Sequence, residues 1–408
     1  MTERLYYSDS YTRQFTARVV ERLIFDDRPA LVLDKTFFYP ASGGQPFDTG
    51  RIAGATVVEV ATRESDKAVV HLLNRPLEAD EVNCEVDWQR RFDHMQQHTG
   101  QHILSQAFLR AADAETVSFH LGLESVTIDL NVEKLSPAAI DNAEDLANEA
   151  VTGNLPVRAW FPTADELLRL PLRKTPDVDG PLRVVAIGDF DYNACGGTHV
   201  AGAGEVGLIK VLKIEREKKG ARVEFRCGAR ALSDYRRKNA IVNQLAADFT
   251  CGIPEVTQSV AKLRAEAQSS HKELKAAKEA LLEHEAAQLA AAAPTLNGWR
   301  VVRQAWADRD PNEIRGLATQ LAALPGAVAL LGTSGSKAHL VFACAENVER
   351  DMNAALKSAL AALGGGRGGG NARLAQGGGV SADLPQVESA LKQAESELLE
   401  SSTDNRQT

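Results

Sequence analysis

The spacing of apolar side chains changes character near Arg91. Residues 13–90 contain short runs rich in β-branched side chains, separated by polar residues or by glycine and proline. The runs are ARVVERLIF, ALVLDKTFF, GATVVEVA, AVVHLL and EVNCEVDW. This pattern predicts a small antiparallel β-barrel. From Phe92 to Ala107 the apolar positions instead recur at helical spacing, which predicts a helix that ends near Ala112.

Strands and helices then alternate up to about residue 232. We expect strands at VTIDLNV, PLRVVAIGDF and VGLIKVLKIE. A helix is expected at PAAIDNAEDLANEAVTG, where Ser136-Pro137 could start it. Together with the helix after Arg91, these elements predict an α+β domain over residues 91–232.

A long helical segment follows, from about Arg230 to Ala293. It is rich in Ala, Glu, Lys, Leu and Gln, and its apolar or small positions alternate three and four residues apart, at Val260, Leu263, Ala267, Ser270, Leu274, Ala277 and Leu281. This predicts a long helix or a short coiled coil, ended by Pro294. Because Ala and Ser occupy several seam positions, a hairpin within the chain and a dimer zipper both remain open.

The remaining chain predicts a compact α/β domain. Residues 299–385 read as strand, helix, strand, strand and helix, followed by the glycine-rich GGGRGGGNARLAQGGG. We expect an ordered loop there rather than a flexible linker, and a final segment of about twenty residues that is helical and then frayed. The chain as a whole is assigned to the α+β class, with a barrel at 1–90, an α+β domain at 91–232, a helical or coiled-coil linker at 233–293 and a C-terminal domain at 294–408.

Composition places the chain among globular cytoplasmic proteins. It is 44% hydrophobic and 25% charged, and its five cysteines are odd in number and widely spread, which favours reduced thiols over a disulfide framework. No apolar segment near Met1 resembles a signal peptide, and nowhere do eighteen apolar residues run together. We therefore expect no export and no membrane span.

Charge is unevenly distributed. The net charge of -9 argues against a protein coated with phosphate-binding side chains. Between Lys210 and Lys238, however, eleven Lys or Arg stand against four Asp or Glu. A partner with phosphates could dock there, and a solvated basic strand and helix face is the alternative.

Two short motifs carry the clearest chemistry. His98 and His102 lie four residues apart in the predicted helix, so both can reach one metal ion. Cys195 and His199 flank Gly-Gly-Thr, where two glycines allow a tight turn. One Cys with three His suits a single tetrahedral Zn²⁺ per chain, and neither an HExxH nor a CxxC motif accompanies them. A structural zinc remains open. His94 could support the ligands from the same helix face, although an exposed histidine is the simpler expectation.

These motifs resemble the editing domain of alanyl-tRNA synthetases and the AlaX proteins. His98-Thr-Gly-Gln-His102-Ile-Leu-Ser and Cys195-Gly-Gly-Thr-His199-Val match its metal motifs. Further similar segments are Phe38 to Pro46, Ser118-Phe-His-Leu-Gly122 with Thr127-Ile-Asp129, Gly220 to Gly228, and Gly364 to Gly379, the last resembling the C-terminal domain shared with DHH phosphodiesterases. Many synthetase editing domains have Gln where this chain has Phe119, which is a departure from the pattern.

The resemblance implies that residues 91–232 form a zinc-dependent editing domain. It also implies a hydrolase that removes serine or glycine from mischarged tRNA(Ala) in trans. We expect no aminoacylation, because the barrel begins within about fifteen residues of Met1, and no phosphodiesterase activity, because no DHH tripeptide is present. Zinc could activate water or hold the substrate, and both mechanisms remain open. The site residues then fall into three groups besides the metal ligands: catalytic donors Gly196, Gly197 and Thr198; substrate-binding Gly43, Gly44, Gln45, Ser118, His120 and Thr127; and tRNA-binding Arg222, Arg226, Arg367, Gly368 and Gly369.

Two further hypotheses compete with this one. The chain could be a zinc-containing tRNA-binding factor without catalysis, or an editing hydrolase for another aminoacyl-tRNA, because threonyl-tRNA synthetases carry a related zinc motif. By resemblance, the helices and the C-terminal domain would grip the tRNA body and could form a homodimer.

Overall fold

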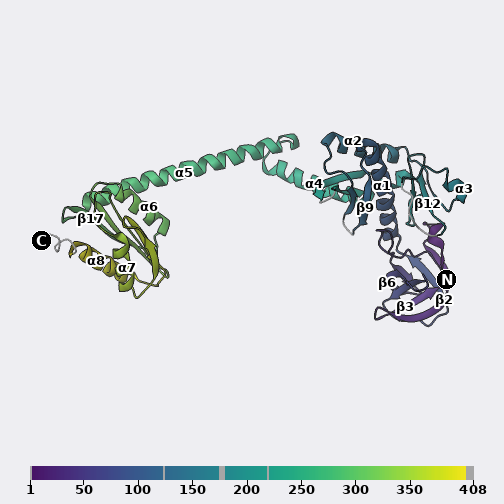
Figure 1. The fold of residues 1–408 in the computed structure, drawn as a ribbon, viewed down its shortest axis with the longest axis horizontal. Coiled ribbons are helices and arrows are strands. Elements are labelled where there is room, and N and C mark those ends of the chain that lie inside the picture. Colours follow the sequence, from purple (N-terminus) through teal and green to yellow (C-terminus); the bar gives the residue numbers. More distant parts are fainter. Residues whose placement is uncertain (1, 123–124, 174–179, 218–219, 401–408) are drawn as a thin grey trace. The chain divides into compact units, whose positions relative to one another are not determined.

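The computed structural model describes residues 2–122, 125–173, 180–217 and 220–400. The chain forms two compact units, Met1–Asp248 and Phe249–Thr408, which are described separately below (Figure 1). Strands and helices are mixed in both units, so the predicted α+β class is confirmed. No helix among the described residues is long and apolar enough to cross a membrane.

The first unit begins with the predicted antiparallel barrel. Six strands close it in the order β2, β3, β7, β6, β5, β8. Alternate residues of β8 point into its core, as the apolar/polar pattern requires. The short strand β5 lies in a stretch where the sequence shows no strand-length apolar run. The strands are β2 (Gln14–Phe25), β3 (Arg28–Leu33), β5 (Gly50–Ile52), β6 (Ala55–Thr62), β7 (Val69–Leu73) and β8 (Glu81–Val86), and β1 (Glu3–Arg4) pairs in parallel with β4 (Lys35–Thr36) outside the barrel.

A 25-residue helix, α1 (Trp88–Ala112), follows the barrel directly. Asp87 caps it by accepting from the Arg90 amide, and Asp113 ends it in the left-handed conformation. Every residue from His94 to Ser105 is buried, so α1 is a central helix covered on all sides. The helix begins at Trp88, three residues before Arg91, where the change of spacing predicted its start.

Two sheets and a second helix pack around α1. One sheet has the order β14-β15-β10-β9 and the other β11-β12-β13. Their strands and the flanking helices are β9 (Thr116–Leu121), β10 (Val126–Leu130), α2 (Pro137–Thr152), β11 (Val157–Trp160), α3 (Ala164–Leu167), β12 (Val184–Ile187), β13 (Asp191–Ala194), β14 (Ile209–Glu217) and β15 (Gly220–Cys227). Ser136 caps α2 through its side chain, as its position before Pro137 predicts.

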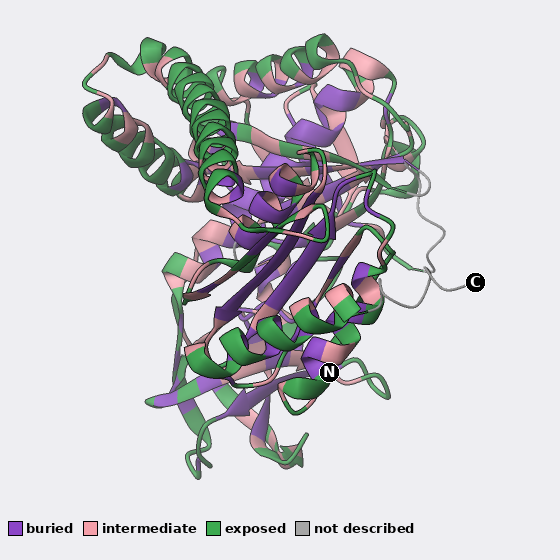
Figure 2. Cartoon of the chain, turned by 90° about the vertical axis from the view of Figure 1, so that its left-hand side faces the viewer, coloured by how far each residue is buried: buried purple, intermediate pink, exposed green. Residues whose placement is uncertain are grey.

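The predicted helical segment over 230–293 consists of two helices rather than one long helix. Helix α4 (Gly228–Asp248) ends the first unit, and α5 (Val256–Ala292) begins only after an interruption. Thr250 has a positive φ of 51°, and Gly252 and Pro254 disfavour helix continuation. The side chains of Val260, Leu263, Leu274 and Leu281 are exposed on α5. Figure 2 shows long exposed stretches of helix, in contrast to the mostly buried strands. Coiled-coil pairing of this seam stays a prediction.

The second unit is built on a six-stranded sheet in the order β16-β17-β18-β19-β21-β20. Helices cover both of its faces, with α7 and α8 on one core cluster and α6 with the end of α5 on the other. The glycine-rich segment forms a strand pair rather than a loop. The elements are β16 (Thr295–Leu296), β17 (Trp299–Ala307), α6 (Pro311–Ala322), β18 (Ala327–Ser334), β19 (His339–Cys344), α7 (Met352–Ala362), β20 (Arg367–Gly370), β21 (Leu374–Gly378) and α8 (Leu384–Glu400). The expected frayed end falls on residues 401–408, outside the described residues.

Candidate metal centre and active site

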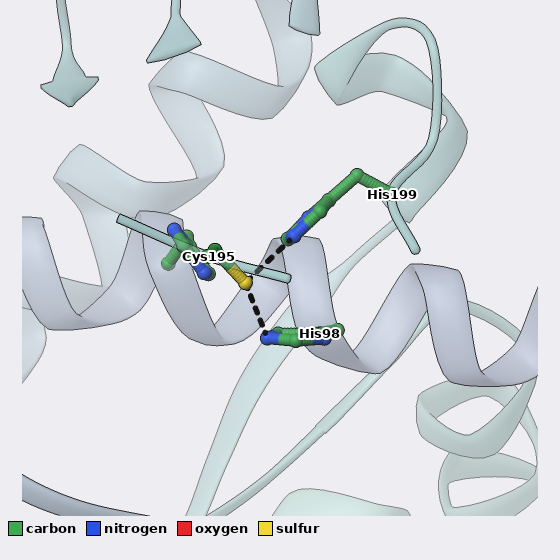
Figure 3. Close-up of side chains that lie close together, drawn as sticks. His98, Cys195 and His199 are labelled. Atoms are coloured by element: carbon green, nitrogen blue, oxygen red, sulfur yellow. Dashed lines mark hydrogen bonds between the residues drawn. The ribbon is translucent and has the colours of Figure 1, made fainter. Parts of the chain in front are cut away.

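Four side chains from two segments converge in the first unit. His98 and His102 lie one turn apart on α1, and Cys195 and His199 lie in the loop that follows β13. One ligand atom from each falls within 4.8 Å of all the others. The Sγ atom of Cys195 is 3.4 Å from Nε2 of both His98 and His199 (Figure 3). The predicted metal residues therefore form one cluster that could hold a metal ion.

The chemistry of the cluster suits a cation. Burial acts to raise the pKa of the Cys195 thiol, but electrostatic interactions with His98 and His199 and a hydrogen bond with His102 outweigh it and hold the pKa well below 9. Burial lowers the pKa of His199 to about 3. For His102 burial also acts to lower the pKa, but hydrogen bonds with Asp191 and Cys195 outweigh it and raise the pKa to about 9. Because these groups bind metal as a thiolate and neutral imidazoles, binding of a cation would release the proton that His102 otherwise holds. One sulfur and three nitrogen donors fit Zn²⁺.

Each histidine is oriented by a second polar group at its Nδ1 atom. Gln45 Oε1 lies 2.8 Å from Nδ1 of His98, and Thr99 Oγ1 lies 3.0 Å from Nδ1 of His199. Asp191 Oδ2 lies 3.2 Å from Nδ1 of His102. These contacts leave the Nε2 atoms free for a metal, and such outer partners fix the ring orientation and raise the basicity of the ligand.

Gln45 also binds the second metal motif. Its Nε2 donates to Thr198 Oγ1 over 2.8 Å, and its Oε1 accepts from the Thr198 amide over 3.1 Å. The side chain is 1% exposed. Gln45 therefore joins the glycine-rich barrel loop to both ligand segments, a role that the resemblance did not specify.

The loop from Cys195 to Thr198 is tightly held. The Gly197 amide donates to Cys195 Sγ, and Arg183 donates to the carbonyls of Cys195 and Gly197. A Cβ on Gly197 would lie 2.2 Å from Cε1 of His98, so only glycine fits there. Of the three predicted donors, the Gly197 and Thr198 amides are occupied, whereas the Gly196 amide makes no hydrogen bond with a described atom. The role of Gly196 as a donor to a substrate stays a prediction.

A buried ion pair fixes the barrel against α1. Arg91 and Asp48 are 1% and 0% exposed, and Arg91 Nε lies 3.1 and 3.0 Å from the two Asp48 oxygens. Arg91 also donates to the Ser10 and Phe37 carbonyls, and Asp48 accepts from the Tyr39 amide. Each partner has its charge neutralised by the other and its remaining polar atoms hydrogen-bonded. Because Asp48 follows the Gln45 loop and Arg91 lies on α1, the pair sets the position of this loop relative to His98.

A cavity of about 500 Å³ opens beside the cluster, which we call the substrate cavity. His98, His102 and Cys195 line it, together with Gly43, Ser118 and Phe119 and the polar residues Gln101, Thr116, Arg173 and Asn193. The Phe119 ring stacks on His98 with ring centroids 5.2 Å apart. A Cβ on Gly44, whose φ is +84°, would lie 2.8 Å from the Phe119 carbonyl, so this glycine lets the loop approach β9.

The alternation of β9 decides which residues of the predicted pocket segment face the metal. Phe119 faces His98, and the side chain of the next residue, His120, projects from the opposite face of the strand, whereas Ser118 still lines the substrate cavity. Ser118 donates to Asp129, and His120 lies opposite Thr127 in the strand pair. His120 and Thr127 are absent from the described lining of the substrate cavity. Their role in substrate binding stays a prediction.

The basic stretch between Lys210 and Lys238 is largely neutralised within the protein. Eight of its nine described Lys and Arg side chains form ion pairs, leaving Arg236; Lys218 and Lys219 lie outside the described residues. Arg222 binds Asp129, and Arg226 binds Asp234 with its own side chain only 16% exposed. Their predicted contact with tRNA would have to compete with these carboxylates.

The other predicted residues lie elsewhere. Arg367, Gly368 and Gly369 are exposed on β20 of the second unit, where their role in tRNA binding stays a prediction. His94 is 1% exposed, so the expectation of an exposed histidine is wrong. Its Nδ1 has no hydrogen-bond partner, and burial, aided by the positive charge of Arg90, lowers its pKa to about 3. A neutral His94 therefore packs beside the cluster without binding its ligands.

Comparisons with known proteins agree with the motifs. Residues 182–223 match the family model for the second additional domain of threonyl and alanyl tRNA synthetases. The alanyl-tRNA editing protein AlaX-L of Pyrococcus horikoshii is 38% identical over 242 residues, covering 57% of this chain and 60% of that protein. The alanyl-tRNA editing protein Aarsd1 of Bos taurus is 34% identical, covering 63% and 61%. The alanine-tRNA ligase of Pyrococcus abyssi is 29% identical, covering 96% of this chain and 43% of the ligase.

The chain thus spans about 60% of the length of the two editing proteins that it matches. The predicted relationship to alanyl-tRNA editing proteins and to alanine-tRNA ligases is confirmed.

Proposed function

Because this chain is related to alanyl-tRNA editing proteins, we propose that it is an aminoacyl-tRNA deacylase. It would hydrolyse the ester that joins a wrongly attached serine or glycine to the terminal ribose of tRNA(Ala). The cluster of His98, His102, Cys195 and His199 beside the substrate cavity carries the proposal. A buried metal-binding cluster that opens on a cavity of this size is the arrangement that a small ester substrate needs.

One zinc ion per chain would be held by these four side chains. When bound, Zn²⁺ supplies Lewis-acid chemistry, either by lowering the pKa of water or by polarising the ester. Gln45, Asp191 and Thr99 keep the three imidazole rings oriented, and the phenyl ring of Phe119 covers His98 and excludes water from one side. The Gly196 amide is the backbone donor available to the oxyanion that develops at the ester carbonyl oxygen.

The selection of serine and glycine over alanine has a physical reason. A synthetase pocket built for alanine rejects similar amino acids by only about 1 to 3 kcal/mol, so a second, hydrolytic site is useful. To select serine, that site must recognise the hydroxyl group that alanine lacks. Gln101, Thr116 and Asn193 line the substrate cavity and are better placed than Thr127 to bond a serine hydroxyl.

Two alternatives keep the same cluster but change its use. Four protein donors within 4.8 Å could close a tetrahedral site, which would make the zinc structural and the chain a tRNA-binding factor. The family model covers threonyl as well as alanyl enzymes, so another aminoacyl-tRNA could be the substrate. A homodimer through the exposed seam of α5 and the C-terminal domain remains part of the proposal.

The decisive assay compares three esters on the same tRNA. Ser-tRNA(Ala), Gly-tRNA(Ala) and Ala-tRNA(Ala) are incubated with the full chain, and the remaining ester is measured over time. We expect loss of serine or glycine while alanine is spared. Intact esters in the presence of bound tRNA would favour the binding factor, and hydrolysis of Ser-tRNA(Thr) in preference to Ser-tRNA(Ala) would favour the threonine system.

A further inference from the structure

A second cavity, of about 1170 Å³, lies in the first unit. The glycine-rich barrel loop around Gly43 separates it from the substrate cavity. The chain around Arg4 and Tyr7 forms one wall, the barrel turn at Lys67 a second, and Trp160 and Phe161 at the end of β11 a third. We call it the aromatic cleft, defined by Tyr7, Trp160 and Phe161. None of these three residues belongs to the groups predicted from the sequence.

The aromatic cleft adjoins the substrate cavity. Ala41 and Ser42 line the cleft, whereas the next residue, Gly43, lines the substrate cavity. A Cβ on Gly196 would lie 3.7 Å from Cε1 of Tyr7, and the Tyr7 carbonyl accepts from Arg183, which also holds Cys195 and Gly197. The loop of Ala41, Ser42 and Gly43 is therefore the wall that the two cavities share, and the loop that contains Cys195 lies beside Tyr7 of the cleft.

The chemistry of the cleft is that of a base-stacking site. The Phe161 side chain is 48% exposed and meets the Tyr7 ring edge-on at 5.8 Å. The Arg158 guanidinium lies 4.7 Å from the centroid of the Trp160 ring, and the Lys67 ammonium has no ion pair with a described carboxylate. Glu3 is the sole acidic residue of the described lining. Phe161 is exposed, and Tyr7 and Trp160 are half-buried. Accessible rings beside cations without an ion pair are how proteins hold single-stranded nucleic acid.

We propose that the aromatic cleft binds the unpaired nucleotides that precede the terminal adenosine of the tRNA. This inference rests on the proposed function, because an ester in the substrate cavity places the terminal ribose at its mouth. The nucleotides before it are covalently attached and must lie in an adjoining space. Their bases stack on Phe161 and Trp160, and Lys67 and Arg4 neutralise their phosphates.

The test uses uncharged tRNA(Ala) that carries 2-aminopurine at the position before the terminal adenosine, whose fluorescence falls when the base stacks. Full-length wild-type protein should quench it on binding. The Phe161→Ala variant should lose most of the quenching and bind about 5- to 150-fold more weakly, the range expected for losing one base–aromatic stack. Phe161→Tyr should restore both. Leu168→Ala is the matched control, since Leu168 is an exposed apolar residue outside the described lining of the cleft.

Equal quenching and affinity for the wild-type protein and Phe161→Ala would overturn the inference, as would an equal loss in Leu168→Ala. The result is separable from the hydrolytic proposal because the probe carries no ester. Quenching that depends on Phe161 without any deacylation would leave the cleft assignment standing while the proposed function fails. Deacylation together with quenching that does not depend on Phe161 would leave the proposed function standing while the cleft assignment fails.

Discussion

The side-chain oxygen of Gln45 lies 2.8 Å from Nδ1 of His98, although 53 residues separate the two along the chain. This contact brings a loop of the β-barrel into the environment of the metal ligands. It also fixes which nitrogen of His98 faces the cluster, because an Nδ1–H that donates to Gln45 leaves Nε2 unprotonated. The barrel is thereby part of the metal site.

Replacing Gln45 with alanine should weaken zinc binding about 10- to 100-fold, the usual effect of removing an outer partner of a metal-bound histidine. Competition with a chromophoric chelator measures the affinity. Gln14→Ala serves as the control because Gln14 is exposed on β2. An unchanged affinity in Gln45→Ala would show that His98 is oriented without it.

Gly197→Ala and Gly196→Ala should differ sharply in zinc content. The new Cβ would lie 2.2 Å from the His98 ring at position 197 but no closer than 3.7 Å to any neighbour at position 196. We expect the first variant to lose most of its zinc and the second to retain it, measured by elemental analysis after gel filtration. Similar zinc contents would contradict the tight packing of this loop.

Asp48→Asn should destabilise the first unit by about 3 to 5 kcal/mol, because it leaves the buried charge of Arg91 without its partner. Hydrogen exchange of the barrel strands in urea reports this unit alone. Asp80→Asn breaks an exposed pair with Arg22 and should change little. A small effect of Asp48→Asn would mean that the pair does not hold the barrel in place.

Stability of the barrel should fall as the pH drops from about 6.5 to about 4. Burial lowers the pKa of His71 to about 4, so in this window the unfolded chain binds more protons there than the folded one. The contribution of His71 to the free energy of unfolding is fully present above pH 6.5 and amounts to about 3 kcal/mol at most. Urea unfolding at several pH values gives the free energy of unfolding as a function of pH. Between pH 6.5 and 4 this free energy should fall less steeply for His71→Gln than for the wild type, and an equal fall in both proteins would contradict this origin.

Local periodicity predicted much of the fold. Alternation in the barrel strands and helical spacing after Arg91 depend only on neighbours in sequence, as do the four-residue spacings of the metal motifs. The interruption near Gly252 and Pro254 rests on local residues too, since glycine and proline disfavour a continuous helix. The cluster of four ligands could be expected because two such motifs suit one ion.

Long-range partners could not be predicted in the same way. Asp191 reaches His102 across 89 residues, and nothing in the sequence near either residue indicates the contact. The face of β9 depends on strand register, so Phe119 rather than His120 meets the metal ligands. The basic stretch loses its free charge because carboxylates such as Asp93, Asp129 and Glu144 are brought to it by folding.

The central claim is that the cluster containing Cys195 hydrolyses mischarged tRNA(Ala). The most direct measurement is single-turnover deacylation of Ser-tRNA(Ala) and Gly-tRNA(Ala) by wild-type protein, Cys195→Ala and Cys251→Ala, with zinc content determined on the same samples. Cys251 lies outside the cluster, so its variant should match the wild type. We predict that Cys195→Ala loses both zinc and deacylation. Unimpaired deacylation by a zinc-free Cys195→Ala protein would contradict the account.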